Sequence, residues 1–221
     1  MARKTKAEAQ QTRLQIIDAA RGVFFARGVS RSTLDEIACA AGVTRGAVYW
    51  HFQNKPELFF AMREQSEVPF LSNAVEQLLD DETVENPLDA IEASLLKIFD
   101  LVQGDENLRV TLEIMTLRCE YVDDFAPVLG ILVGSHDRLL SKLEHAYRRS
   151  ARRGFMRKGL KSDVLALETL VFVSGLIQRW LSVPGCRANP IWRQMIRSHV
   201  WVKSADGAPQ TAGRRAGRPR C

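Results

Sequence analysis

Cysteine is scarce in this sequence, and its four copies do not build a structural site. Cys39, Cys119, Cys186 and Cys221 lie far apart, no C-x-x-C pair occurs, and no His stands at metal-ligand spacing from any of them. A disulfide framework or a zinc site requires regularly spaced ligands, so the sequence predicts neither, and it predicts no cofactor. Cys39 and Cys119 fall within helical patterns, where we expect small core residues.

Long apolar runs and strand patterns are missing as well. No stretch of eighteen apolar residues is available to span a membrane, and no apolar run follows the basic N-terminus as a signal peptide requires. We therefore expect a cytoplasmic protein without a membrane partner. No segment alternates apolar and polar residues long enough to predict a strand, so the expected fold class is all-α.

Catalytic patterns are the third absence. No Ser, His and Asp group, no paired carboxylates and no Gly-rich phosphate loop occur in a setting that suggests chemistry. An enzyme is therefore not expected.

The charge of the chain is unevenly distributed. The net charge of the 221 residues is +5, but residues 1–55 hold nine Lys or Arg and four Asp or Glu, and residues 204–221 hold four Arg and one Asp. Both ends are basic and the middle is slightly acidic. A basic N-terminal domain on a near-neutral body is typical of a protein that meets phosphate groups with one end only.

Helical periodicity runs through most of the chain, and the expected helices fall in three regions. We expect an N-terminal domain over 1–55, a larger domain over 56–203 and a disordered basic tail over 204–221, which either solubilises the protein or adds affinity for DNA. The expected helices, bounded by Gly, Pro and capping residues, lie at about 12–27, 33–42, 45–52, from 54 to about 67, 72–80, 87–103, 105–121, 124–152, 162–183 and 190–202.

Residues 33–52 predict a helix-turn-helix. Thr33 and Glu36 have the spacing of a capping box, so a helix begins at Thr33, and Gly42 provides the left-handed residue that ends it. Thr44 then caps a second helix, whose apolar Val48 and Phe52 stand four residues apart and face the first helix. Two short helices joined by a turn with Gly are typical of DNA-binding proteins, although a helical hairpin without that purpose is the alternative.

The face of the second helix opposite Val48 and Phe52 carries residues that donate hydrogen bonds or lie flat against a sugar-phosphate backbone. A helix exposed only to water more often carries Glu, Lys and Gln there. Trp50 has two interpretations, packing between helices or lying against the DNA backbone, and we expect packing. The residues of this face are Thr44, Arg45, Gly46, Tyr49, Trp50 and His51.

The residues of this region carry a resemblance to a known family. The run from Leu34 to Leu58, with Ala40 to Phe52 and then Asn54 and Lys55, resembles the DNA-binding domain of the TetR family of bacterial repressors. The segment Met1 to Lys6, with Glu113-Ile114 and Cys119-Glu120, resembles the AcrR-type branch that controls multidrug efflux pumps. The resemblance implies a repressor of a resistance-nodulation-division efflux operon that lipophilic drugs release. The alternatives are a regulator or activator without a drug ligand, and an enzyme with an appended DNA-binding domain.

Individual roles on double-stranded DNA follow from residue chemistry. We expect Arg45 to read a guanine through its paired donors, and Gly46 to allow close approach. Lys55, at the positive end of the fourth helix, is expected to hold a phosphate with the backbone amides. Residues 1–11, with Arg3, Lys4 and Lys6, are expected to form a mobile arm that contacts DNA or is merely solvated. The residues expected mainly to hold phosphates are Thr33, Thr44, Tyr49, His51 and Lys55.

The fourth helix is expected to connect DNA binding to a ligand. It starts beside the DNA, and Pro69 predicts a break near Glu67 or Val68, which is compatible with a hinge or with a simple bend. Glu67 lies in an apolar stretch and is either an exposed residue at the break or a carboxylate inside the ligand pocket. The resemblance to AcrR-type regulators implies the second position, from which a carboxylate would attract cationic lipophilic inducers. The further candidates for the ligand cavity are Phe70, Phe99, Met115, Cys119 and Phe172.

The last two helices are expected to form a homodimer interface. The segment 162–183 is apolar over most of its circumference, so one flank needs a partner, and by resemblance the two helices form a four-helix interface with their symmetry mates. A single helix-turn-helix offers few contacts, whereas a two-fold dimer reads a palindromic operator with half-sites about one DNA turn apart. The candidate interface residues are Leu170, Ser174, Gly175, Ile177, Trp192 and Ile196.

Overall fold

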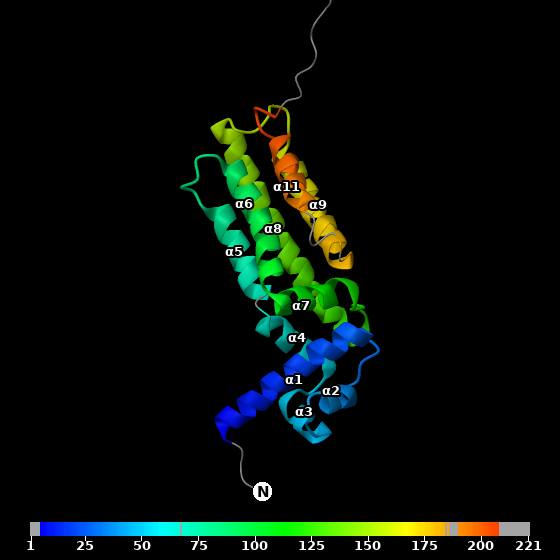
Figure 1. Ribbon diagram of the computed structural model, residues 1–221. Helices are drawn as coiled ribbons and strands as arrows, with labels where there is room; N and C mark the ends of the chain where they lie inside the picture. The colour runs from blue at the N-terminus through cyan, green and yellow to red at the C-terminus, as the bar shows by residue number, and fades with distance from the viewer. Residues whose placement is uncertain (1–4, 67, 184, 186–189, 208–221) are drawn as a thin grey trace, which may run out of the picture.

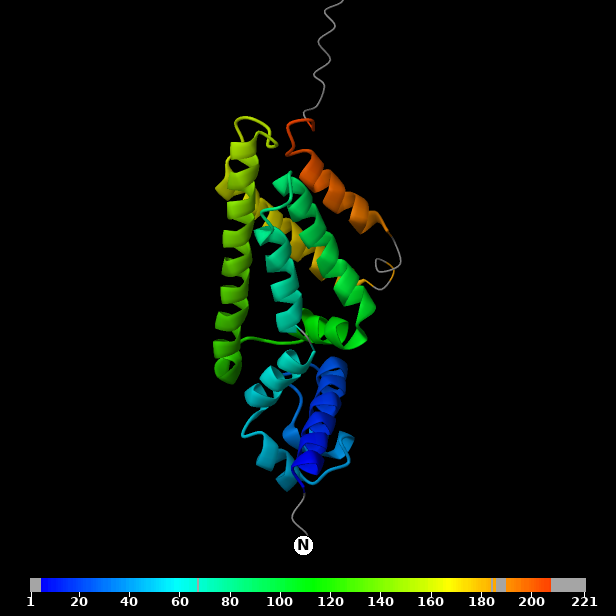
Figure 2. The ribbon, with the colours of Figure 1, turned by 90° about the vertical axis from the view of Figure 1, so that its left-hand side faces the viewer.

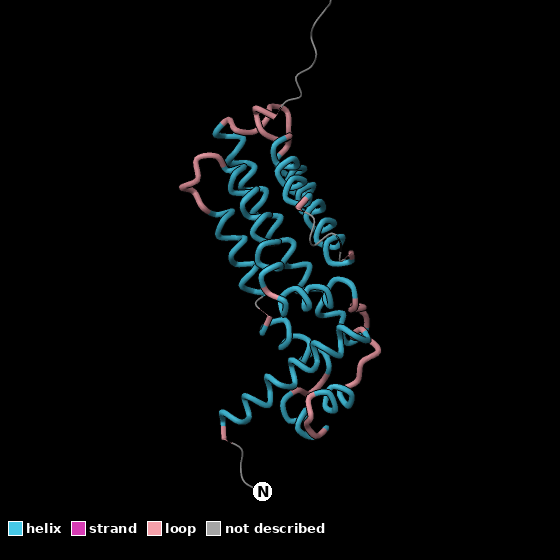
Figure 3. Tube along the Cα trace, in the orientation of Figure 1, coloured by secondary structure: helices cyan, strands magenta, loops and turns pink. Residues whose placement is uncertain are grey.

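The fold is entirely helical in the part of the chain that the structure describes. The computed structural model describes residues 5–66, 68–183, 185 and 190–207 (Figures 1 and 3), and within these ranges no strand forms apart from an isolated bridge between Met156 and Ser204. The all-α prediction is therefore confirmed. The α-helices are α1 (Lys6–Arg27), α2 (Leu34–Ala40), α3 (Arg45–His51), α4 (Lys55–Gln65), α5 (Val68–Asp80), α6 (Pro87–Gly104), α7 (Glu106–Leu117), α8 (Ala126–Arg153), α9 (Ser162–Ser182) and α11 (Ile191–Trp201), with a short 3-10 helix η1 (Asp123–Phe125).

The helices form two groups that are stacked end to end. Figure 1 shows α1–α3 at the end where the N-terminus lies and the long helices α5, α6, α8, α9 and α11 at the other end. Helix α7 lies crosswise between them, and the view turned by 90° shows the same order (Figure 2). Helices α1, α4 and α7 therefore lie at the junction of the two groups.

Helix α1 begins earlier than the sequence analysis predicted. Thr5 and Glu8 form a capping box, in which the Thr5 hydroxyl accepts from the Glu8 N–H and the Glu8 carboxylate accepts from the Thr5 N–H. The expectation of a mobile arm up to residue 11 is therefore wrong for residues 5–11. Arg3 and Lys4 lie outside the described residues.

The buried side chains of the N-terminal group belong to the same hydrophobic cluster as those of the second group. Ile16, Ile17 and Phe24 of α1 are fully buried, as are Ile37 of α2 and Val48 of α3. Cys39 is exposed, so its assignment to the core is wrong: the buried residues of α2 are Ile37 and Ala38.

The predicted break of the fourth helix is present. Helix α4 ends at Gln65 and α5 begins at Val68, which places Pro69 in the first turn of α5, where its missing N–H costs no helical hydrogen bond. Helix α5 thus begins four residues before the predicted start at residue 72. Glu67 lies outside the described residues.

The segment after α7 leaves the helical path sooner than predicted. Helix α7 ends at Leu117 instead of residue 121, and the Arg118 carbonyl accepts a hydrogen bond from the Val29 N–H at 2.9 Å. The chain after α7 is therefore tied to the loop after α1. Ser204 to Gly207, expected to be disordered, are also held: the Ala205 N–H donates to the Phe155 carbonyl at 2.8 Å. The remainder of the expected tail, 208–221, lies outside the described residues.

Candidate nucleic-acid interface and ligand cavity

The turn between α2 and α3 has the predicted local structure. The Thr33–Glu36 capping box is present, and Gly42 has a φ of 65°, in the left-handed region that favours glycine. The Thr44 hydroxyl accepts from the Ala47 N–H at 3.2 Å and so caps α3. Both threonines are exposed and act as caps; their contact with phosphate stays a prediction.

Helix α3 has one buried side and one exposed side. Val48 is fully buried and Phe52, directly after the helix, is 1% exposed, whereas Tyr49 is 45% and Trp50 is 73% exposed. The expectation that Trp50 packs between helices is wrong, since two residues beyond Val48 turn a helix by about 200° and point the side chain away from the core. The Trp50 and His51 rings meet edge to face with centroids 4.5 Å apart.

Arg45 is exposed, and its guanidinium contacts both Asp35 of α2 and Tyr49 of α3. Its Nε lies 3.0 Å from an Asp35 carboxylate oxygen, and its Nη2 donates to the Tyr49 hydroxyl at 3.4 Å. The hydrogen bond to Tyr49 and the charge of Asp35 raise the pKa of Arg45. Because the side chain is already oriented, fewer of its rotamers are lost when it meets a base edge.

An open groove separates the first turns of α1 from α3. Its volume is about 770 Å³. A Cβ on Gly46 would meet only the Thr44 hydroxyl, at 3.9 Å, so the protein itself leaves room for a side chain there. The absence of a side chain at Gly46 therefore makes space only for a molecule that approaches from outside the protein. The lining residues are Thr5, Lys6, Ala9, Thr12, Thr44, Gly46, Ala47, Trp50 and His51.

The α1 side of this groove was missed by sequence reasoning. Thr5 and Lys6 were assigned to a mobile arm, although the Thr5–Glu8 spacing is the same capping signal that was recognised at Thr33. The structure places Lys6 in the first turn of α1, in the wall of the groove beside α3.

Lys55 is turned into the protein, which corrects its predicted phosphate contact. Its Nζ donates to the backbone carbonyls of Ser30 at 3.1 Å and Ser32 at 2.9 Å, and it lies 5.9 Å from the centroid of the Phe125 ring. Burial lowers the pKa of Lys55. The ammonium group therefore ties the start of α4 to the loop before α2 and to η1.

Further contacts join the two helix groups. The Phe59 ring of α4 lies 6.1 Å from Phe24 of α1 and meets Phe125 edge to face at 5.5 Å. Buried Arg21 of α1 donates from Nε to the Thr111 hydroxyl at 3.3 Å and from Nη1 to the Asn107 side chain at 3.1 Å, both on α7. A displacement of α4 or α7 must therefore be felt by α1 and by the loop that leads into α2.

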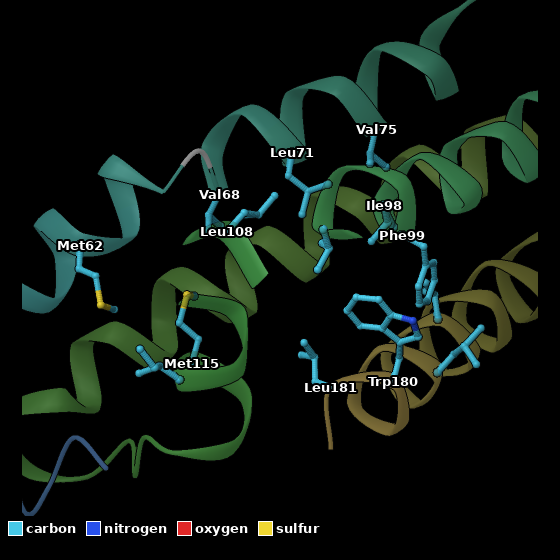
Figure 4. Packing of buried hydrophobic residues seen from close by; sticks show 14 of the residues in the cluster. Met62, Val68, Leu71, Val75, Ile98, Phe99, Leu108, Met115, Trp180 and Leu181 are labelled. Carbon is cyan, nitrogen blue, oxygen red and sulfur yellow. The ribbon is translucent and has the colours of Figure 1, made fainter. Parts of the chain in front are cut away.

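A cavity of about 170 Å³ lies in the second helix group, between α4 and the helices α5–α9. Apolar side chains form most of its wall, and Figure 4 shows several of them on facing helices. The charged residues at the wall are Arg63 and Glu76, which sequence reasoning missed. The lining residues are Arg63, Val68, Leu71, Ser72, Val75, Glu76, Ile98, Leu112, Met115, Leu132, Ser135, His136, Leu139 and Ile177.

The structure places the predicted ligand-binding residues in different environments. Met115 lines the cavity, but Phe99 is 1% exposed and stacks on Trp192 at 4.6 Å in the core, so its ligand role is wrong. Phe172 stacks on His199 at 4.0 Å, between α9 and α11. Cys119 lines a separate surface depression with Arg118 and Glu120, where burial raises the pKa of its thiol to about 11. Glu67 and the side chain of Phe70 lie outside what the structure describes.

The predicted dimer residues differ in their exposure within the subunit, and the dimer interface itself stays a prediction. Trp192 and Ile196 are buried within the subunit, at 4% and 0% exposure, so they do not form a surface. Ile177 lines the cavity, Leu170 and Ser174 are half-buried, and Gly175 is exposed. The exposed large apolar residues of these helices are Val164, Leu167, Val171, Ile191, Met195 and Trp201.

Helix α9 is the one described helix long and apolar enough to match a membrane span by length and composition. It packs along α8, and seven of its residues, including Leu165, Val173 and Trp180, are buried in the helical bundle. Its apolar character is therefore accounted for in part by packing within the subunit.

Comparisons with known proteins agree with this geometry. A family model described as bacterial regulatory proteins, tetR family, matches residues 16–62, and a model of the C-terminal region of MAATS-type transcriptional repressors matches residues 86–186. The chain is 38% identical over 188 residues to the HTH-type transcriptional regulator TtgR of Pseudomonas putida, covering 83% of this chain and 87% of TtgR.

Two solved structures are similar over nearly their whole length. NalD, the secondary repressor of the MexAB-OprM multidrug efflux pump in Pseudomonas aeruginosa, superposes with a TM-score of 0.75 at 27% identity and covers 90% of this chain and 98% of its own. SmeT, the repressor of the Stenotrophomonas maltophilia pump SmeDEF, superposes in its triclosan complex with a TM-score of 0.72 at 28% identity, covering 95% of this chain and 100% of its own.

Proposed function

Because this chain belongs to the TetR family of bacterial regulatory proteins, we propose that it represses a multidrug efflux operon and is released from DNA by lipophilic compounds. The observation that carries the proposal is the exposed side of α3, where Arg45, Tyr49 and Trp50 point outward while Val48 anchors the helix in the core. The similarity to TtgR, NalD and SmeT supports efflux control. The protein would act in the cytoplasm without enzymatic activity.

On DNA, we assign α3 to the major groove and the start of α1 to the adjacent backbone. Arg45 would read a base, Thr33, Thr44, Tyr49 and His51 would hold phosphates, and Gly46 would permit close approach. Lys6, beside the groove, takes the electrostatic role that Lys55 does not have in this structure. Exposed Trp50 would lie against the sugar-phosphate backbone.

The functional unit would be a two-fold dimer that reads a palindrome. The proposed contact surface is the apolar stripe Val164, Leu167 and Val171 of α9, beside Gly175 and the exposed residues of α11. Analytical ultracentrifugation of Val171→Asp should show monomers that remain helical. A stable Val171→Asp dimer would place the interface elsewhere.

Induction would follow from linkage between the cavity and DNA. A ligand that binds the conformation with misplaced α3 helices more tightly lowers operator affinity by the ratio of its two affinities. The expectation of a cationic inducer depends on Glu67, outside the described residues. Arg63 and Glu76 are the charged residues in the wall of the cavity, and we propose a lipophilic inducer.

Footprinting of the DNA upstream of the gene, with and without triclosan and a panel of lipophilic drugs, tests the proposal. A protected palindrome that is lost on addition of a drug supports it, and the absence of any protected site at low salt would refute it.

The cavity is smaller than the roughly 300–1,000 Å³ of drug-sized pockets, which favours a second candidate, a regulator without a drug ligand. Thermal-shift screening separates the two, because a ligand at 100 times its dissociation constant stabilises the protein by about 2.7 kcal/mol.

A further inference from the structure

Among the described residues, Arg63 is the only charged residue in the wall of the cavity whose side chain is nine-tenths buried. It lies in the last turn of α4 and is 8% exposed. Its Nη1 donates to the carboxylate of neighbouring Glu64, whose side chain is 60% exposed, but its buried Nε has no hydrogen-bond partner among the described residues. A buried donor of a cationic group that lacks an acceptor is unfavourable. The Arg63 Nε–H is therefore an unsatisfied donor that a ligand could pair with.

The other charged group at the cavity is compensated. Glu76 of α5 lies 3.6 Å from Arg138 of α8, and its side chain is 24% exposed, so its charge is both paired and reached by water. His136 and Ser135 of α8 line the same wall; His136 is exposed. Arg63 is therefore the group whose interaction with a ligand would be least screened.

We propose that the inducer is an apolar, one- or two-ring compound that carries a hydrogen-bond acceptor, preferably an anionic one such as a carboxylate or phenolate, and that Arg63 binds this acceptor. The inference rests on the proposed function of the cavity and names its ligand class. The apolar wall takes the rings, and a charge-assisted hydrogen bond from the Arg63 Nε takes the acceptor. This class differs from the cationic compounds that a carboxylate at position 67 would select.

The position of Arg63 also connects ligand binding to DNA binding. Arg63 lies eight residues after Lys55, about 12 Å along the same helix. A ligand held by Arg63 at one end of α4 and by α5–α9 around it changes the position of Lys55 at the other end, where the ammonium group holds the loop before α2. Arg63 would thus act as a ligand-binding residue and as the point where the ligand moves α4.

Three naphthalene probes with the same ring system test the ligand class. Isothermal titration calorimetry of the full chain should give the order 2-naphthoate, then 2-naphthamide, then 2-naphthylmethylammonium, with at least about a tenfold span. Arg63→Met should weaken 2-naphthoate by about 10- to 100-fold and leave the ammonium probe within about twofold. Arg63→Lys keeps a charge but not the Nε donor and should recover part of the loss.

Matched controls separate this role from a general effect of charge or folding. Arg148→Met removes a guanidinium of α8 that does not line the cavity and whose side chain is 64% exposed, and it should leave 2-naphthoate affinity within about twofold. Circular dichroism should show that each variant is folded. The proposal would be overturned if the three probes bound equally, if none of them bound, or if Arg63→Met left 2-naphthoate affinity unchanged. It would also be overturned if the ammonium probe bound best and Glu67→Gln abolished that preference.

Failure of this inference and failure of the proposed function are distinguishable. If lipophilic drugs release the operator but 2-naphthoate binding does not depend on Arg63, only the ligand class is wrong. If no operator is found, or if no drug releases the protein from it, the proposed function itself is wrong.

Discussion

Replacing Lys55 with Met distinguishes a residue that binds DNA from one that joins two parts of the protein. In the structure, the Lys55 ammonium donates two hydrogen bonds, to the Ser30 and Ser32 carbonyls. Hydrogen bonds from a charged donor contribute about 1.5–3 kcal/mol when well shielded, and Lys55 is only partly buried. We therefore expect Lys55→Met to lower the free energy of unfolding by about 1–2 kcal/mol, measured by urea denaturation.

The same variant should change the salt dependence of DNA binding very little. Each phosphate contact contributes about −0.9 to the slope of log affinity against log salt concentration. Fluorescence anisotropy with a duplex at several salt concentrations should give Lys55→Met nearly the slope of the parent protein, whereas Lys6→Ala, in the groove beside α3, should flatten it. A flatter slope for Lys55→Met with unchanged stability would refute the structural role and restore the phosphate contact.

Three further outcomes are expected. Arg45→Ala should cost about 1–3 kcal/mol of operator affinity and relax specificity at one base pair, and equal losses on operator and random DNA would contradict base reading. Phe99→Ala should lower the free energy of unfolding by about 3–5 kcal/mol because its ring stacks on Trp192 in the core; a change confined to ligand affinity would contradict this. Burial lowers the pKa of His199 to about 4, so the unfolded state binds more protons than the folded state between about pH 6.5 and 4. The free energy of unfolding, measured with urea, should therefore fall as pH falls through that window, and His199→Gln should flatten this dependence. An unchanged pH dependence in His199→Gln would show that another group is responsible.

The contacts around α4 suggest how the two helix groups act together. Its first residue, Lys55, holds the loop before α2, Phe59 lies between Phe24 and Phe125, and Arg63 reaches the cavity. A helix with contacts at both ends and in its middle transmits a displacement without needing to change its own structure. The break before Val68 makes α4 and α5 two separate helices.

The sequence by itself determined the local features of this protein. The capping boxes, Gly42 and Pro69 act within a few residues, and their effect on the backbone is steric or a matter of nearby hydrogen bonds, so the helix-turn-helix and the break after α4 were readable. Helical periodicity likewise identified Val48 and Phe52 as the buried side of the second short helix.

Tertiary structure alone decided which side of each later helix meets the core, the cavity or the solvent. Helix α9 is apolar around most of its circumference, so periodicity could not tell that Ile177 lines the cavity while Val171 is exposed. Lys55 illustrates the same limit, since its partners lie more than twenty residues away in sequence, at Ser30 and Ser32. Burial and hydrogen bonding depend on elements that the chain brings together only on folding, and the roles that depend on them follow from the fold.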